Sequence, residues 1–192
     1  MDISVDTIRT VTLSNFKHFG LDTDVELRIT KRGSPPLGGG EVRFICPTVR
    51  VVKPIQFVDQ GRIKRIRGIA IVESARAEST TGVLMSAELM GEKGESPEDI
   101  GARCAKQLLG EVEKGGCFDS MHQWMAFLFM VLSTEDVSKT RIGRLTQFSI
   151  QFLRDLQEFF NVTFKIKPDD ETNTLLMTCV GVGYLNVNKK LI

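Results

Sequence analysis

A glycine-rich stretch between two strand-like segments carries the groups best suited to binding an anion. It reads Arg32-Gly33-Ser34-Pro35-Pro36-Leu37-Gly38-Gly39-Gly40-Glu41-Val42. The prolines fix φ, and the three successive glycines allow backbone conformations that are closed to other residues. Consecutive exposed N–H groups in such a turn can cradle an anion. The alternative is a hairpin loop that needs glycine for its geometry alone.

Positive charge is concentrated around this stretch, although the whole chain has a net charge of only +1. Between Arg28 and Arg67, ten basic residues stand against Glu41 and Asp59, a net charge of +8, which leaves −7 for the rest of the chain. Such asymmetry is expected of a surface that binds phosphates, and the alternative is a solvated strand face whose charges share a sign. The residues predicted to bind phosphate, RNA or a partner are Arg32, Gly38, Gly39, Gly40, Arg43, Arg62, Lys64, Arg65 and Arg67.

This charge pattern leads to an expectation about geometry. The two strands that flank the glycine-rich stretch and the strand that begins at Gly61 are close in sequence, so we expect them to lie side by side in one sheet. Alternation along the strands then exposes the basic residues and turns their apolar neighbours inward. The exposed members would be Arg43, Arg62, Lys64 and Arg67, and the inward-facing neighbours Phe44, Ile63 and Ile66.

Histidine and cysteine, common nucleophiles and metal ligands, show no catalytic pattern here. We expect His18 to interact favourably with the C-terminus of its helix, and His122 to be a satisfied, partly buried polar group. The four cysteines form no C-x-x-C pair and have no histidine at zinc-ligand spacing. We therefore expect reduced, mostly buried thiols and no metal site.

The elements that position these residues are of both types, which predicts an α+β fold. Helices are expected over 4–19, 96–114, 121–132 and 146–160, and strands over 24–31, 41–52, 61–71, 82–89, 138–143, 162–166 and 175–184. Ser4 or Asp2, Ser96 and Thr146 can cap their helices, and Gly20 can end the first one. The third helix is apolar around most of its circumference, so we expect it to be covered on several sides.

Some features of this pattern stand out. Segment 73–81 has little apolar content, and no strand is predicted for it. Helix–strand–strand order occurs at 4–52 and again at 146–184, which suggests a supersecondary unit used more than once. No apolar run reaches the roughly 18 residues of a membrane span, and the first residues lack the basic and apolar regions of a secretory signal. We therefore expect no membrane association.

The glycine-rich stretch resembles the signature of the RNA 3'-terminal phosphate cyclase family. That signature has the order Arg-Gly, two residues, Pro, one residue, Gly-Gly-Gly, one residue, Val. Segments 53–57 and 61–68 resemble the eukaryotic, cyclase-like branch that does not cyclise, and the match recurs at Glu98-Asp99-Ile100-Gly101 and Val180-Gly181-Val182-Gly183-Tyr184. The resemblance implies repeated βαβαββ-type units with helices packed on four-stranded sheets.

The resemblance also implies that the chain is incomplete relative to the family. Residues 1–60 would be the C-terminal part of a core repeat, 61–90 a remnant of the family's insert domain, and 91–192 the C-terminal core repeat. The family's N-terminal repeats would precede Met1, and the chain would pass from the insert's first strand, near Ala70-Ile71, directly to its last, at 82–89. A splice variant, a gene-model error and a true deletion would all produce this pattern.

The resemblance implies loss of the family's chemistry. Cyclases use a histidine that becomes adenylylated, and Leu145 stands at the matching position, where it offers neither a nucleophile nor a proton. We therefore expect no cyclase activity and no cofactor. The family also places a charged cluster at Arg154 and Asp155, where Gln157 replaces the lysine of some relatives. An Arg–Asp pair can bind phosphate and activate water, and the alternative is a solvated helix face.

The resemblance further implies a non-catalytic factor in early processing of precursor ribosomal RNA for the small (40S) subunit. The expected partners are a ribosome-assembly GTPase, precursor ribosomal RNA and the small-subunit processome, in the nucleus and nucleolus. The alternative, from a different class, is an enzyme, either an endonuclease that cleaves precursor ribosomal RNA through Arg154 and Asp155 or a residual nucleotide-dependent modifier of RNA ends.

Overall fold

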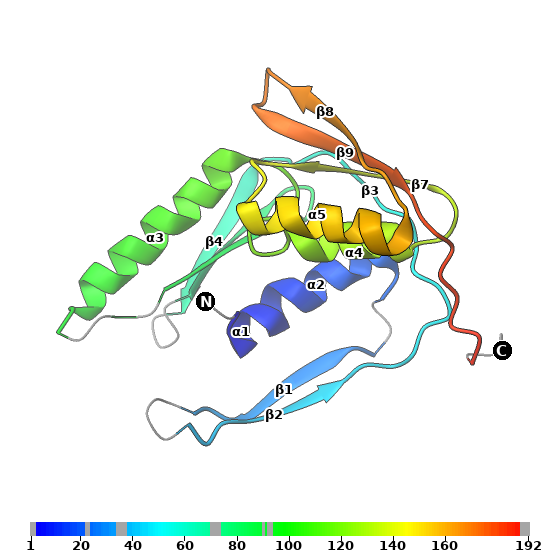
Figure 1. Ribbon diagram of the computed structural model, residues 1–192. Coiled ribbons are helices and arrows are strands. Elements are labelled where there is room, and N and C mark those ends of the chain that lie inside the picture. Colours follow the sequence, from blue (N-terminus) through cyan, green and yellow to red (C-terminus); the bar gives the residue numbers. More distant parts are fainter. Residues whose placement is uncertain are drawn as a thin grey trace.

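Helices pack between and beside three separate β-sheets (Figure 1). A computed structural model describes residues 3–21, 24–33, 38–69, 74–89, 91 and 94–188 of the chain. Within these residues both element types are well represented, so the α+β class expected from the sequence is confirmed. The predicted junction at Ala70-Ile71 and the candidate cap Asp2 lie outside the described residues.

The N-terminal helix, residues 5–19, changes its winding along its length. It consists of α1 (Val5–Thr7), a π-helical turn (Ile8–Thr12), α2 (Leu13–Phe16) and a 3₁₀ turn (Lys17–Phe19). As predicted, the Ser4 side chain caps its start by accepting a hydrogen bond from the Thr7 N–H, and Gly20 ends it at φ +71°. The π-helical turn is not visible in the sequence, and such turns occur frequently at functional sites.

The three sheets have simple topologies. β1 (Glu26–Lys31) and β2 (Glu41–Ile45) form an antiparallel two-stranded sheet. A four-stranded sheet has the order β3-β7-β9-β8, from β3 (Gln56–Phe57), β7 (Val137–Ile142), β9 (Thr174–Val180) and β8 (Lys165–Asp169). A three-stranded antiparallel sheet has the order β4-β5-β6, from β4 (Ile63–Ile69), β5 (Ser74–Ser79) and β6 (Leu84–Glu88).

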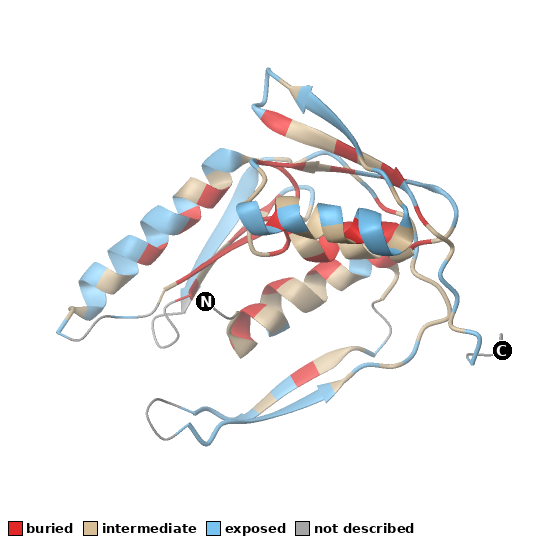
Figure 2. Ribbon diagram, in the orientation of Figure 1, coloured by how far each residue is buried: buried red, intermediate tan, exposed pale blue. Residues whose placement is uncertain are grey.

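The core gathers around α4, which is buried on several sides as its apolar sequence predicts (Figure 2). α4 (Gln123–Leu132) contacts α5 (Gln147–Phe160) and β9, while α3 (Pro97–Lys114) packs on β5 and β6. Ser96 and Thr146 cap α3 and α5 as predicted. Among the described residues, no helix combines the length and apolar content needed to cross a membrane.

Several strand predictions need correction. The second strand ends at Ile45 rather than at 52, and β8 begins at Lys165 rather than at 162. Segment 74–79, for which no strand was predicted, forms β5, the central strand of its sheet. Its small side chains, such as Ala77 and Ser79, are buried against the neighbouring elements. β9 ends at Val180, so the glycine pair at 181 and 183 lies beyond it.

A close backbone approach does explain the first glycine of that pair. A Cβ on Gly181 would lie 2.3 Å from the Ser133 carbonyl oxygen. Only glycine fits at this position, which lies beyond the strand and not within it as the predicted range 175–184 implied.

A helix followed by a hairpin occurs twice, as the sequence suggests. The N-terminal helix precedes the β1–β2 hairpin, and α5 precedes the β8–β9 hairpin. The second hairpin belongs to a four-stranded sheet, whereas the first forms a sheet of its own. Buried residues from 1–60, 61–90 and 91–192 share one core, including Phe19, Met85 and Phe127. The division into those three segments remains a prediction.

Candidate functional site

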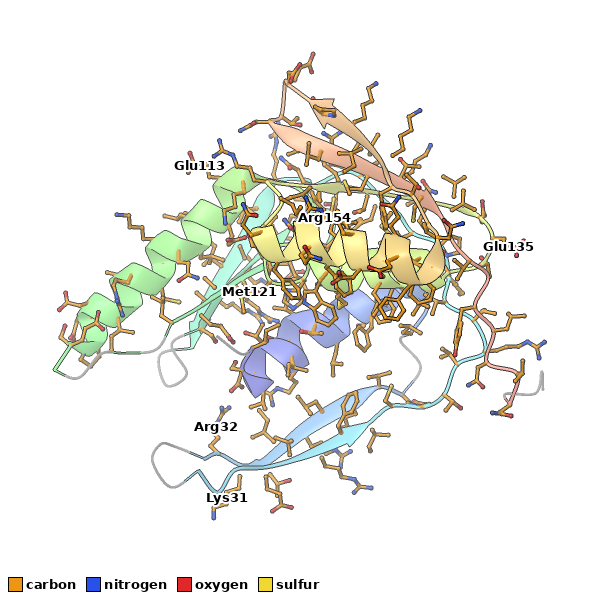
Figure 3. The ribbon with its side chains drawn as sticks, in the orientation of Figure 1. Lys31, Arg32, Glu113, Met121, Glu135 and Arg154 are labelled. Carbon is orange, nitrogen blue, oxygen red and sulfur yellow. The ribbon has the colours of Figure 1, made fainter. Side chains whose placement is uncertain are left out.

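The first residue of the glycine-rich stretch is tied to the N-terminal helix. The Arg32 guanidinium donates hydrogen bonds through Nη1 and Nη2 to the buried Asp6 carboxylate, with Nη2 2.9 Å from Oδ1, and Arg9 lies 3.5 Å from the same carboxylate. Figure 3 shows Arg32 at the end of the hairpin nearest this helix. The Arg32 hydrogen bond outweighs burial and lowers the pKa of Asp6. The charge of Arg32 is therefore largely committed to holding the hairpin.

The glycines of the stretch are required by backbone geometry. Gly38 and Gly39 have φ of +64° and +77°, a region that favours glycine. A Cβ on Gly33 would lie 2.5 Å from the Gly40 nitrogen, so the two ends of the loop approach too closely for a side chain. Residues 34–37 lie outside the described residues, so an anion cradle here remains a prediction.

We expect Gly39→Val to destabilise the protein by about 1–3 kcal/mol, because valine at φ +77° is strained even though no heavy atom lies within 4 Å of the added Cβ. The midpoint of urea unfolding, compared with that of the wild type, measures this loss. An unchanged midpoint would mean that the loop adopts another backbone conformation at no cost and acts only as a flexible connector.

The basic residues do not share one sheet, contrary to the prediction. β1 and β2 pair with each other, whereas β4 pairs with β5 in a different sheet. Phe44 and Ile66 are 53% and 57% exposed, and Ile63 is exposed as well, so these side chains do not face the interior. The prediction assumed a covering layer, but β2 and β4 are edge strands whose side chains are exposed in both directions.

Acidic neighbours reduce the free charge on β4. Lys64 Nζ lies 2.8 Å from Glu78 Oε1, and Arg65 lies 4.0 Å from the same carboxylate. Arg67 is exposed on this strand and Arg62 is exposed just before it, whereas Arg43 stands opposite Arg28 on the hairpin. The basic residues thus form two groups, one on the hairpin and one on β4.

A polar junction joins the N-terminal helix to β5 and β6. Arg76 Nη1 donates to the Thr10 carbonyl oxygen at 3.1 Å. Glu88, which is 4% exposed, accepts a 2.9 Å hydrogen bond from the Ser4 N–H and another from the Ser4 hydroxyl. Sequence reasoning missed this junction, because Arg76 and Glu88 lie in segments that offered no motif.

Beneath this junction lies a buried chain of hydrogen bonds. Asp119 Oδ1 is 2.6 Å from His122 Nδ1, and His122 Nε2 is 2.8 Å from Thr12 Oγ1, at the end of the π-helical turn. The order hydroxyl, imidazole, carboxylate is that of a catalytic triad. The imidazole and carboxylate are only 1% and 0% exposed, however, so substrate has no access to them and we interpret the chain as structural. The prediction that His122 is a satisfied polar group is confirmed.

His18 behaves differently from the prediction. Its ring stacks on Phe57 with centroids 4.1 Å apart, and burial lowers its pKa. The neutral ring is therefore favoured, and stacking replaces the predicted charge interaction with the helix end. Of the cysteines, Cys104, Cys117 and Cys179 are buried free thiols and Cys46 is exposed, which agrees with the prediction. Burial raises the pKa of Cys117 and Cys179 to about 12, so these thiols are poor nucleophiles.

Comparison with known proteins decides the family. The family model for RNA 3'-terminal phosphate cyclase matches residues 1–166. The chain belongs to the RNA 3'-terminal phosphate cyclase family. It is 39% identical to the "Probable RNA 3'-terminal phosphate cyclase-like protein" of Dictyostelium discoideum, over 97% of this chain and 67% of that protein.

Two further relatives are similar over the same extent. The "RNA 3'-terminal phosphate cyclase-like protein" of Homo sapiens is 40% identical over 100% of this chain and 66% of its own length. The "rRNA processing protein rcl1" of Schizosaccharomyces pombe is 38% identical over 99% of this chain and 66% of its own length. The chain thus spans about two thirds of the length of these relatives. The human alignment covers 248 positions against 192 residues here, so that relative carries internal residues with no counterpart in this chain.

Family membership gives the remaining predicted residues their context. Leu145, at the position where the resemblance requires histidine, packs partly buried against the core. Arg154 is exposed on α5 (Figure 3), and Asp155 Oδ1 accepts a 2.8 Å hydrogen bond from Gln151. Among the described residues no ion pair joins Arg154 to Asp155, so the geometry adds no support to RNA cleavage by this pair. A catalytic role for it stays a prediction.

Proposed function

We propose that the chain acts as a non-catalytic binding factor in the processing of precursor ribosomal RNA for the small subunit. The single observation that carries the proposal is its membership in a family in which a relative with 38% identity is named an rRNA processing protein. Leu145 supports the non-catalytic part, because an alkyl side chain cannot take the place of an adenylylated histidine. The proposed location is the nucleolus, and the proposed partners are precursor RNA, the small-subunit processome and a ribosome-assembly GTPase.

The exposed charge on β4 supports an RNA-binding role. Arg67 projects from an edge strand and Arg62 from the residue just before it, where guanidinium groups can reach backbone phosphates. Such contacts position a protein on RNA without reading its sequence, and they weaken as salt rises. The surface would therefore contribute affinity, and partner contacts elsewhere would supply specificity.

We expect no covalent adenylate and no 2',3'-cyclic phosphate end when the purified protein is incubated with labelled ATP and RNA that ends in a 3'-phosphate. The physical reason is the missing nucleophile at Leu145. Leu145→His alone should not restore activity, since a nucleophile also needs neighbouring groups that activate it. A labelled band that survives denaturation, or ATP-dependent cyclisation, would contradict the non-catalytic proposal.

We expect the triple change of Arg62, Lys64 and Arg67 to Ala to weaken RNA binding at low salt and to flatten its salt dependence. Each lost phosphate contact should reduce the slope of log K against log salt by about 0.7–0.9. Fluorescence anisotropy with a single-stranded oligoribonucleotide, titrated at several salt concentrations, measures both effects. The same variant should also bind the GTPase partner less tightly if that partner presents an acidic surface.

A matched control removes the same charge elsewhere. Lys106, Lys165 and Lys167 are exposed on α3 and β8, so their triple change to Ala keeps the net charge equal to that of the test variant. Both variants should keep the wild-type free energy of unfolding to within about 0.5 kcal/mol. Equal binding by the two variants would assign the effect to net charge, and unchanged binding would show that the β4 charges form only a solvated face.

A further inference from the structure

A small cavity lies where the N-terminal helix meets β4 and β5. Its volume is about 320 Å³, at the lower end of the range for ligand sites, about 300–1,000 Å³. Three elements supply polar groups to its walls, and these groups come from Thr7, Thr10, Arg67, Ser74 and Arg76. All five are described residues, and only Arg67 was singled out in the sequence.

The described residues that line this cavity include two basic side chains, Arg67 and Arg76, and no acidic one. Arg67 and Arg76 are direct cross-strand partners on β4 and β5, a position where like charges repel. Burial and the neighbouring Arg67 lower the pKa of Arg76. The nearest acidic side chain on β5, Glu78, already pairs with Lys64 at 2.8 Å. An anion between the two guanidinium groups would remove this repulsion.

Hydrogen-bond donors in the cavity also lack partners. The hydroxyls of Thr7 and Ser74 make no hydrogen bond among the described residues, although the two residues are only 3% and 8% exposed. Neither hydroxyl oxygen is fully enclosed, so both can donate to a group that enters the cavity. The Thr10 hydroxyl differs, because it donates to the Asp6 carbonyl oxygen at 2.8 Å.

One guanidinium is already held in place for binding. Arg76 Nη1 donates to the Thr10 carbonyl oxygen at 3.1 Å, which fixes the side chain and leaves its other N–H groups available. A guanidinium fork and hydroxyl donors together match the oxygens of a phosphoryl group, which accept several hydrogen bonds at once.

We propose that this cavity binds a phosphoryl group between Arg67 and Arg76, with the Thr7 and Ser74 hydroxyls as further donors. The inference does not depend on the RNA-processing role proposed above, because a free phosphate compound would satisfy the same groups. The phosphoryl group can belong to an RNA backbone or to a small phosphate compound, and the experiment separates these sources.

The test follows backbone amide shifts of the isotope-labelled protein during titration with inorganic phosphate at constant ionic strength. We expect saturable shifts around Thr7 and Arg76. Arg67→Gln and Thr7→Val should each weaken phosphate binding about tenfold, the usual effect of losing a hydrogen bond to a charged group. Arg67 is exposed, and Thr7→Val preserves shape, so both variants should fold. Lys106→Gln, on an exposed residue of α3 outside the cavity lining, removes the same charge as a control and should bind phosphate like the wild type.

A parallel titration with a single-stranded oligoribonucleotide identifies the source. If Arg67→Gln and Thr7→Val weaken binding of the oligoribonucleotide as well as binding of inorganic phosphate, the occupant is an RNA backbone phosphate. If the two variants weaken binding of inorganic phosphate alone, the occupant is a small phosphate compound. Equal phosphate affinity in both cavity variants and the wild type would overturn the proposal, and so would equally tight binding of acetate.

Discussion

The Gly116→Ala variant should lose about 2–6 kcal/mol of its free energy of unfolding, enough to leave many domains largely unfolded. Gly116 lies just after the end of α3 and forms an isolated antiparallel bridge with Ile142 of β7, a strand of the four-stranded sheet. Its φ of +90° is costly for alanine, and an added Cβ would lie 2.6 Å from both the Gly143 nitrogen and the Ile142 Cα. These are backbone atoms, so the clash cannot be relieved by rotating a side chain.

A glycine in the same neighbourhood provides the matched control. Gly110 lies inside α3, and no heavy atom lies within 4 Å of a Cβ built on it. Gly110→Ala should therefore stabilise the protein by about 0.5–1 kcal/mol, since alanine loses less conformational freedom in a helix. Urea unfolding of both variants measures effects of opposite sign. If Gly116→Ala unfolds at the wild-type midpoint, the backbone between α3 and β7 must be able to shift at little cost.

Helix boundaries could be predicted because their signals are local. Ser96 and Thr146 each accept a hydrogen bond from the N–H three residues later, and Gly20 adopts the left-handed conformation that ends a helix. Each signal depends only on a few neighbouring residues. α4 was also predictable as a covered helix, since a helix that is apolar around its circumference has to be buried.

Strand pairing could not be predicted in the same way, because it depends on residues that are distant in sequence. β5 was missed since its residues are small or charged, and it is a strand only because β4 and β6 flank it. Phe44 and Ile66 were assigned to the interior on alternation alone. Alternation identifies two faces of a strand, but it does not say whether a layer covers either of them.

The polar junction illustrates the same limit for the candidate site. Thr12 and His122 are 110 residues apart, and Arg76 meets Thr10 across 66 residues, so no motif spacing connects them. The π-helical turn that ends at Thr12 has no sequence signature. Arg67 was found because basic residues cluster around it, whereas its partner Arg76 stands in a segment of mixed charge.

The Asp119→Ala variant should lose about 3–5 kcal/mol, the usual effect of removing one partner of a buried ionic and hydrogen-bonded group. Asp119 accepts hydrogen bonds from the Ser86 N–H at 2.8 Å, the Ser86 hydroxyl at 2.6 Å and the His122 N–H at 3.0 Å, besides its contact with the imidazole. It therefore joins β6 to the start of α4. Alanine would leave these donors buried without an acceptor.

Acidity should change the size of this loss. Burial alone would raise the pKa of Asp119, but its interactions with His122 and Ser86 outweigh burial and hold the pKa below its usual value. A carboxylate with a lowered pKa stabilises the fold at pH values above its unfolded pKa, about 3.9, and that contribution disappears as pH falls through the folded value. The stability difference between wild type and Asp119→Ala should therefore be constant near neutral pH and should narrow below about pH 4.

Asp155 supplies the control for both effects. It lies partly exposed on α5 and accepts one hydrogen bond, from Gln151, so Asp155→Ala should change stability by less than about 0.5 kcal/mol at any pH. Urea unfolding followed by circular dichroism at several pH values compares the two variants directly. A loss in Asp119→Ala no larger than that in Asp155→Ala would mean that water or a rearranged side chain satisfies the Ser86 and His122 donors. The Asp119–His122–Thr12 chain would then not be what holds the N-terminal helix against α4 and β6.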